Sequence, residues 1–287
     1  MRGLGFSTII GCLSQGEKLM GVSPSDWMSS HPGAELFMER QAGWRESLER
    51  FGEELRSFAT NDPTEVAKKA SEWNMRLAMP PTFPNGSIYM ISQLKELIEW
   101  AVAGSVVSGR PWPEFRLKGH SVSFHIHGGS REPVVSLMTK KEGDIVYLTR
   151  WNQPLDGFDL LRQIEKIEAG MVEQDNFSGV DIPCVKAEVE PDLGWLLGMK
   201  NMDWFVAYAK QRIEFGMNRF GFAQREETVM VTMRGIAPAP RPIYQLSPNG
   251  ESFLFWRRRS GVKFPVSMYQ FDQVDFKDPG DLKNIVA

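Results

Sequence analysis

The sequence lacks the features that identify several large classes of protein. It contains only two cysteines, Cys12 and Cys184, among 287 residues, too few for the disulfide framework of a small secreted domain. It has no apolar run long enough to cross a bilayer, and no phosphate-binding loop, dinucleotide fingerprint, Cys-x-x-Cys pair or nucleophile elbow. Its net charge of −3 gives no basis for binding nucleic acid or an anionic membrane. The sequence therefore predicts a globular protein without a complete catalytic signature.

The composition is that of an ordinary soluble chain. Hydrophobic residues make up 42% and charged residues 24%, close to the averages for globular domains, and the length permits a sizeable core. The two cysteines favour buried free thiols in a reducing, cytoplasmic compartment. Residues 9–12 also match a lipoprotein cleavage box, which would make Cys12 the lipid-modified residue of an exported protein. The segment before this box is shorter and less apolar than a working signal needs, so we expect a cytoplasmic protein, with lipoprotein export via Cys12 as the alternative.

The first 112 residues are predicted to form mainly helices. Over 35–59, and again over 88–102, apolar side chains recur at spacings of mostly three and four residues, as on one face of a helix. An Asp-Pro pair with a following glutamate gives a further segment, 62–77, a good helix start. Residues 104–113 are rich in glycine, proline and serine and mark the end of this helical region.

Over 113–287 apolar and polar residues alternate in short segments, which is typical of strands. One helix is expected, over 156–169. Turn signals such as Ser260-Gly261 favour antiparallel pairing, and the last hairpin should place Phe253 and Phe255 on one buried face. The predicted strands are 115–117, 122–126, 134–138, 145–151, 179–189, 206–217, 228–234, 253–258 and 262–271. The chain as a whole is expected to be an α+β protein, with a helical N-terminal part packed on an antiparallel-sheet-rich C-terminal part.

Several short motifs of the C-terminal half occur in an order that resembles the serpin family. Residues 182–183 (Ile-Pro) stand where a conserved strand of the family would be, and 197–199 (Leu-Gly-Met) resemble the motif after its short helix. Residues 215–221 resemble the strand that enters the serpin reactive-centre loop, and 253–255 resemble a late strand of the core. The order of the motifs carries the resemblance, which begins at about residue 130 and does not include the helical N-terminal region.

The resemblance implies a reactive-centre loop that begins at a hinge near Gly221. Inhibitory serpins insert this loop into their main sheet after cleavage, so the hinge must tolerate burial. Here Phe222 follows, and the charged residues 225–227 precede Thr228; each charge would lose its hydration if it turned inward. Three prolines near the end of the loop stiffen it and can present Arg241 outward. The resemblance therefore implies a non-catalytic, non-inhibitory scaffold without a cofactor, which binds another protein through Gly221, Phe222, Thr228 and Arg241.

Three of the four histidines support an alternative hypothesis. His125 and His127 alternate along a predicted strand, so their side chains point to the same face, and the spacing from Gly119 to Glu132 resembles the first metal motif of the cupin family. Two imidazoles and a carboxylate can hold one divalent ion as facial ligands, and His120 would join them only through a β-bulge. No histidine follows residue 127, so a second cupin motif would lack its histidine. The alternative function is a metal-dependent enzyme or sensor that uses His125, His127 and Glu132.

The strongest cluster of positive charge is Arg257-Arg258-Arg259, at the end of a predicted strand. We expect it to form a solvated strand end, with binding of an anion or a partner as the alternative. The expected partner of the protein is another protein, and nothing in the sequence indicates its oligomeric state.

Overall fold

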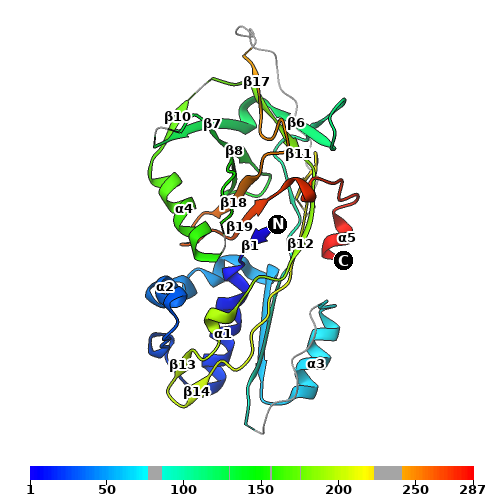
Figure 1. Ribbon diagram of the computed structural model, residues 1–287. Helices are drawn as coiled ribbons and strands as arrows, with labels where there is room; N and C mark the ends of the chain where they lie inside the picture. The colour runs from blue at the N-terminus through cyan, green and yellow to red at the C-terminus, as the bar shows by residue number, and fades with distance from the viewer. Residues whose placement is uncertain (77–85, 129, 156, 175, 223–240) are drawn as a thin grey trace.

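The computed structural model describes residues 1–76, 86–128, 130–155, 157–174, 176–222 and 241–287. Its largest element is a seven-stranded sheet in which every neighbouring pair of strands is antiparallel, in the order β1-β19-β18-β9-β8-β7-β10 (Figure 1). The strands are β1 (Arg2–Gly3), β7 (Val122–His127), β8 (Val134–Met138), β9 (Asp144–Arg150), β10 (Met171–Gln174), β18 (Phe253–Arg259) and β19 (Ser267–Phe271).

A four-stranded sheet packs on one face of the large sheet, in the order β17-β11-β6-β5. Its strands are β5 (Ser105–Val107), β6 (Glu114–Lys118), β11 (Gly179–Pro183) and β17 (Ile243–Gln245). The pair of β11 with β17 is parallel and the others are antiparallel. Phe253, Phe255 and Phe271 of the large sheet are fully buried on this side and share a core with Phe115 and Ile182 of the smaller one. The alternation of side chains along each strand thus fills the space between two sheets.

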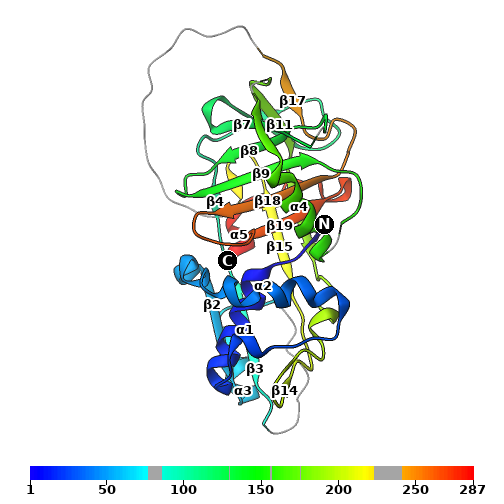
Figure 2. The ribbon, with the colours of Figure 1, turned by 90° about the vertical axis from the view of Figure 1, so that its left-hand side faces the viewer.

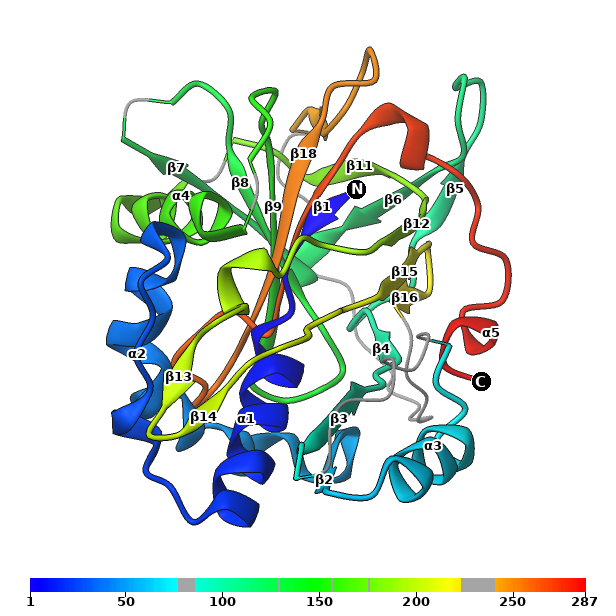
Figure 3. The same ribbon diagram turned by 60° about the horizontal axis from the view of Figure 1, so that its bottom comes forward.

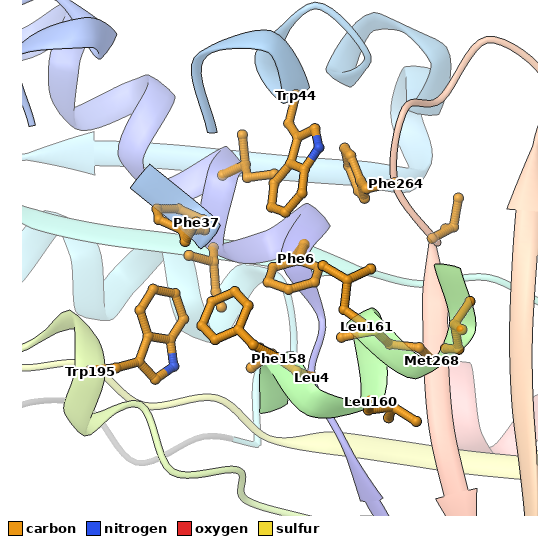
Figure 4. Close-up of a cluster of buried hydrophobic side chains, with 14 of the residues drawn as sticks. Leu4, Phe6, Phe37, Trp44, Phe158, Leu160, Leu161, Trp195, Phe264 and Met268 are labelled. Atoms are coloured by element: carbon orange, nitrogen blue, oxygen red, sulfur yellow. The ribbon is translucent and has the colours of Figure 1, made fainter. Parts of the chain in front are cut away.

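Helices cover the other face of the large sheet. Helix α4 (Gly157–Ala169) lies across its strands, and α1 (Phe6–Met20) and α2 (Glu35–Arg45) lie below them (Figure 2). Phe6 is at the centre of this second core, where its ring centre lies 4.8 Å from that of Trp44 and 5.6 Å from that of Phe158 (Figure 4). Because these three side chains come from α1, α2 and α4, one buried cluster joins the N-terminal helices to the sheet.

Two separate two-stranded ladders stand apart from these sheets, and the first of them packs on α1. In one, β2 (Leu55–Thr60) pairs with β3 (Tyr89–Leu94), and in the other, β12 (Val185–Val189) pairs with β15 (Ile213–Met217). Within the described residues, β3 and β15 do not pair with each other. Short pairs complete the strands: β4 (Ile98–Glu99) with β16 (Gly221–Phe222), and β13 (Lys200–Asn201) with β14 (Trp204–Phe205). The remaining helices of the described ranges are α3 (Pro63–Glu72) and α5 (Lys283–Val286), together with six short 3-10 segments.

The α+β class and most predicted elements of the C-terminal part are confirmed. Strand β18 pairs with β19, and Phe253 and Phe255 are buried on one face, although residues 260–266 make a longer connection than the expected two-residue turn. Helix α4 lies where it was predicted. The predicted strand 228–234 lies outside the described residues. The large sheets also include strands from before residue 113, since β1 pairs with β19 and β5 with β6.

Of the helices predicted in the N-terminal region, one is partly wrong and one is entirely wrong. The segment 35–59 is helical only to Arg45; a 3-10 segment with a non-helical kink at Gly52 follows, and the chain then enters β2. The segment 88–102 forms β3 and β4 instead of a helix. The predicted helix 62–77 is confirmed only over Pro63–Glu72, as α3, and residues 73–76 are not helical. Its first turn is capped by the carboxylate of Asp62, which accepts from the Thr64 amide at 2.7 Å.

Candidate functional site

A cleft of about 360 Å³ lies between the edges of β3 and β15. Helix α1 lines it with Ile9, Cys12 and Leu13, and residues 206–216 line its far side. Because β3 already pairs with β2, and β15 with β12, the two edges that face the cleft have no ladder partner within the described chain. An open edge of this kind can accept an extended segment of polypeptide.

The predicted hinge residues lie at one end of this cleft. After β15 the chain reverses through a two-residue turn, in which Asn218 and Gly221 exchange backbone hydrogen bonds at 3.0 and 3.2 Å. Gly221 has a φ of +151°, and a Cβ at this position would overlap the carbonyl oxygen of Ile98, so only glycine fits. The turn therefore directs Phe222 into the space between β15 and β4.

Phe222 is an anchor rather than an exposed residue. Its side chain is 6% exposed, and its ring centre lies 5.4 Å from that of Trp100 and 5.5 Å from that of Phe255. The guanidinium of Arg257 lies 5.7 Å from the centre of the same ring, within the range of a cation–π contact. The start of the predicted loop is thus held against β18 of the large sheet, through Phe255, and against Trp100.

The other end of the loop is attached as well. Arg241 is exposed, but its carbonyl oxygen accepts a hydrogen bond from the Ser178 hydroxyl at 2.7 Å, and the carbonyl of Pro242 accepts from the Ser178 amide at 3.1 Å. The chain then enters β17, which runs parallel to β11. Of the four predicted binding residues, Gly221, Phe222 and Arg241 thus lie at the two ends of the loop, and Thr228 lies outside the described residues.

A buried ionic network lies below Phe222, and the sequence had not predicted it. Arg257 is fully buried and Arg259 is 6% exposed, so the prediction of a solvated strand end is wrong. The Asp144 carboxylate accepts from Arg257 Nη1 at 2.6 Å and from Arg259 Nε at 2.8 Å, and Glu96 pairs with both arginines. These carboxylates come from distant parts of the chain, and they turn the positive cluster into a neutralised core.

Glu54 belongs to the same network. Its carboxylate pairs with Lys141 and with Arg259 Nη1, the latter at 2.8 Å. Burial raises the pKa of Glu54, but hydrogen bonds with Lys141 and Glu96 and the charge of Arg259 outweigh burial and lower that pKa to about 2. Glu54 therefore stays charged in the folded protein at any pH near neutrality.

The predicted metal ligands do not converge. His125 Nε2 forms a hydrogen bond with the Ser136 hydroxyl at 3.0 Å. Glu132 instead accepts from Arg150 Nη1 at 2.9 Å and from the Tyr244 hydroxyl at 2.8 Å. His127 lies two residues along β7 from His125, and burial lowers the pKa of both histidines. The described part of the chain contains no group of three or more His, Cys, Asp or Glu residues that could hold a metal ion.

The two cysteines are free thiols, and neither is in a disulfide. Cys12 lies within α1 and Cys184 between β11 and β12, and burial raises the pKa of each thiol to about 12, so neither is a thiolate at neutral pH. The residues before Cys12 supply β1 and the buried Phe6 and Ile10. Cleavage ahead of Cys12 would remove this part of the core. No helix in the described ranges is long and apolar enough to cross a membrane, and cellular location stays a prediction.

Comparison by sequence identifies no relative: no protein-family model matches this chain, and no curated protein matches it either. Solved structures do match. SRPN18 from Anopheles gambiae superposes with a TM-score of 0.51 at 12% identity, over 97% of this chain and 93% of that one. Human thyroxine-binding globulin, in complex with thyroxine, gives 0.49 at 8% identity over 94% and 88%. Tengpin, a thermophilic serpin in its native state, gives 0.47 at 11% identity over 73% and 63%.

At such low identity the match to SRPN18 establishes the fold alone. It extends over the N-terminal helices as well as the strands that carry the sequence motifs, so the expectation that the resemblance begins near residue 130 is wrong. The N-terminal region escaped notice because it shares the arrangement of elements but no motif. The chain has a serpin-like fold over nearly its whole length.

Proposed function

We propose that this protein is a non-catalytic, non-inhibitory scaffold of serpin-like fold that binds another protein through the loop between Phe222 and Arg241. The observation that carries the proposal is the attachment of both loop ends to folded sheets. Phe222 is buried against Trp100 and Phe255, and the Arg241 and Pro242 carbonyls accept from Ser178. Prolines at 238, 240 and 242 restrict the backbone next to Arg241. A loop with fixed ends and few backbone conformations loses less entropy on binding a partner.

The sequence that follows Phe222 argues against an inhibitory mechanism. If the chain continued as a strand along β15, the inward side chain of Phe222 would set the alternation, and residues 224, 226 and 228 would point inward. The Glu226 carboxylate would then point into the cleft, whose wall on the α1 side includes Ile9 and Leu13. An unpaired buried carboxylate costs several kcal/mol. That penalty opposes the rapid insertion on which an inhibitory serpin depends.

The proposal is tested by replacing the loop while its anchors stay in place. Residues 223–240 are exchanged for a glycine–serine linker of equal length, and Arg241→Ala is made separately. We expect proteins captured from lysate of the source organism by the wild type to elute reversibly in SDS. At least one should be lost with the linker variant and bind more weakly to Arg241→Ala.

Arg162→Ala is the matched control for the loss of an arginine, because Arg162 is exposed on α4 and its ion pair is a surface pair with nearby Asp159 at 2.9 Å. It should capture the same proteins as the wild type. Equal capture by the wild type and the linker variant would contradict a role for the loop. An SDS-resistant adduct with a trypsin-like or chymotrypsin-like protease would contradict the non-inhibitory assignment.

A further inference from the structure

The last residues of the chain, 280–287, cross the outer side of the cleft, and we name this segment the strap. It follows the core strand β19 and includes α5. Figure 3 shows α5 between β15 and α3. Ile285, Val286 and Ala287 all line the cleft. The strap is therefore a wall of the cleft that belongs to neither of the two strand ladders.

On the β15 side, the strap rests on a glycine. A Cβ on Gly216 would overlap the Cδ1 atom of Ile285 and lie 2.9 Å from Cβ of Pro279, so the absence of a side chain at this position makes room for the strap. The side-chain amide of Asn218 donates to the carbonyl of Gly280 at 3.1 Å. Leu282 is 7% exposed and is the buried apolar anchor of the segment.

On the β3 side, the contacts are polar. Lys95 Nζ and Asn74 Nδ2 both donate to the carbonyl oxygen of Ala287, each at 3.2 Å. Arg76 adds a bond to the Asn284 carbonyl at 3.5 Å and pairs with Glu214 of β15 at 2.8 Å. The strap thus bridges the two ladders that the backbone leaves unpaired.

The strap is held less firmly than the strand β19 that precedes it. Leu282 is buried, Ile285 packs on Gly216, and the hydrogen bonds of Ala287 and Asn284 are exposed, whereas every residue of β19 is buried. Segments with few buried apolar contacts open locally at a small fraction of the global unfolding free energy. The strap can therefore leave while the sheets stay folded.

We propose that the strap is a gate, which narrows the cleft when it is seated on Gly216 and admits solvent or ligand more readily when it is released. The gate acts on the cleft whether or not the loop binds a protein, so it goes beyond the proposed function. Cys12 offers a natural reporter, because its thiol lines the same cleft, while Cys184 lies in the other core.

The test compares thiol labelling of the full chain with an uncharged maleimide, with each cysteine quantified by peptide mass spectrometry. Gly216→Ala displaces Ile285 without shortening the chain, and its backbone conformation accepts alanine, since its φ is not positive. We expect Cys12 to be labelled roughly tenfold faster than in the wild type, as the loss of one or two hydrogen bonds would produce. Lys283→Ala, an exposed change on the strap, should leave the rate unchanged.

The labelling rate of Cys184 distinguishes opening of the gate from unfolding of the protein. Its labelling should stay slow in every variant, and if it accelerates in Gly216→Ala, the milder Ile285→Ala decides the question by the same readout. Faster labelling of Cys12 alone, in either variant, supports the gate. Unchanged labelling of Cys12 in both variants, or simultaneous labelling of both cysteines in both, overturns the proposal.

Discussion

Replacement of Asp144 by alanine is expected to produce one of the largest losses of stability available to a single polar substitution in this protein. Asp144 begins β9, is 3% exposed, and lies between two arginines of β18. The substitution leaves the backbone of β9 in place but removes the carboxylate that faces Arg257 and Arg259. Both guanidinium groups then stay in the core with less charge to balance them.

The magnitude follows from the contacts that are lost. Asp144 accepts three charge-assisted hydrogen bonds, at 2.6 Å from Arg257 and at 2.8 and 3.1 Å from Arg259. Removing one partner of a buried ion pair costs about 3–5 kcal/mol. Glu96 still pairs with both arginines, so we expect the lower end, about 3 kcal/mol. This is a large part of the 5–15 kcal/mol that is typical of a whole domain.

Urea unfolding followed by tryptophan fluorescence and far-UV circular dichroism measures this loss. Asp159→Ala is the matched control, because it removes an aspartate whose partner, Arg162, is exposed; such surface pairs contribute less than about 1 kcal/mol. If Asp144→Ala destabilised the protein no more than Asp159→Ala, the buried network would not have the energetic role assigned to it.

Three further results are expected. Because the pKa of Glu54 is lowered from 4.5 to about 2 in the folded protein, its stabilisation is complete above pH 4.5 and is lost as the pH falls toward 2; Glu54→Gln should flatten the stability profile in that window, and an unchanged profile would refute the assignment. Phe6→Ala should cost about 3–5 kcal/mol in urea unfolding, since Phe6 is fully buried; a loss below about 1 kcal/mol would contradict its central place. Purified wild type and a His125→Ala/His127→Ala double variant should carry the same substoichiometric metal by elemental analysis; one equivalent lost with the histidines would restore the metal hypothesis.

The sequence predicted local structure well where the spacing of apolar residues favours the same element as the tertiary contacts. It failed where pairing with a distant strand determines the element. In 88–102 the apolar residues lie three and four apart, as in a helix, yet Tyr89 and Ile91 are also two apart and become the buried positions of β3. Pairing with β2, more than 25 residues earlier, selects the strand. No local pattern contains that information.

The same limit applies to the candidate site. Gly221 and Phe222, which the resemblance gave as hinge residues, follow β15 in the structure, and their role in binding stays a prediction. The resemblance could not show that Phe222 is buried, nor that Arg257 faces it. The arginine cluster was predicted to be solvated because Glu54, Glu96 and Asp144 are far from it in sequence, and only the fold brings them together.

Thermal unfolding before and after cleavage of the loop near Arg241 tests the central claim most directly. Limited trypsin digestion can cut after Arg225 or Arg234, whereas the Arg241–Pro242 bond resists trypsin, and differential scanning calorimetry compares the nicked and intact proteins. A serpin-like scaffold whose loop cannot enter the cleft should show a Tm that is unchanged or lower after cleavage. A rise of about 10 °C or more, equivalent to several kcal/mol in a chain of this size, would mean that the loop had inserted as a new strand, and would contradict the account.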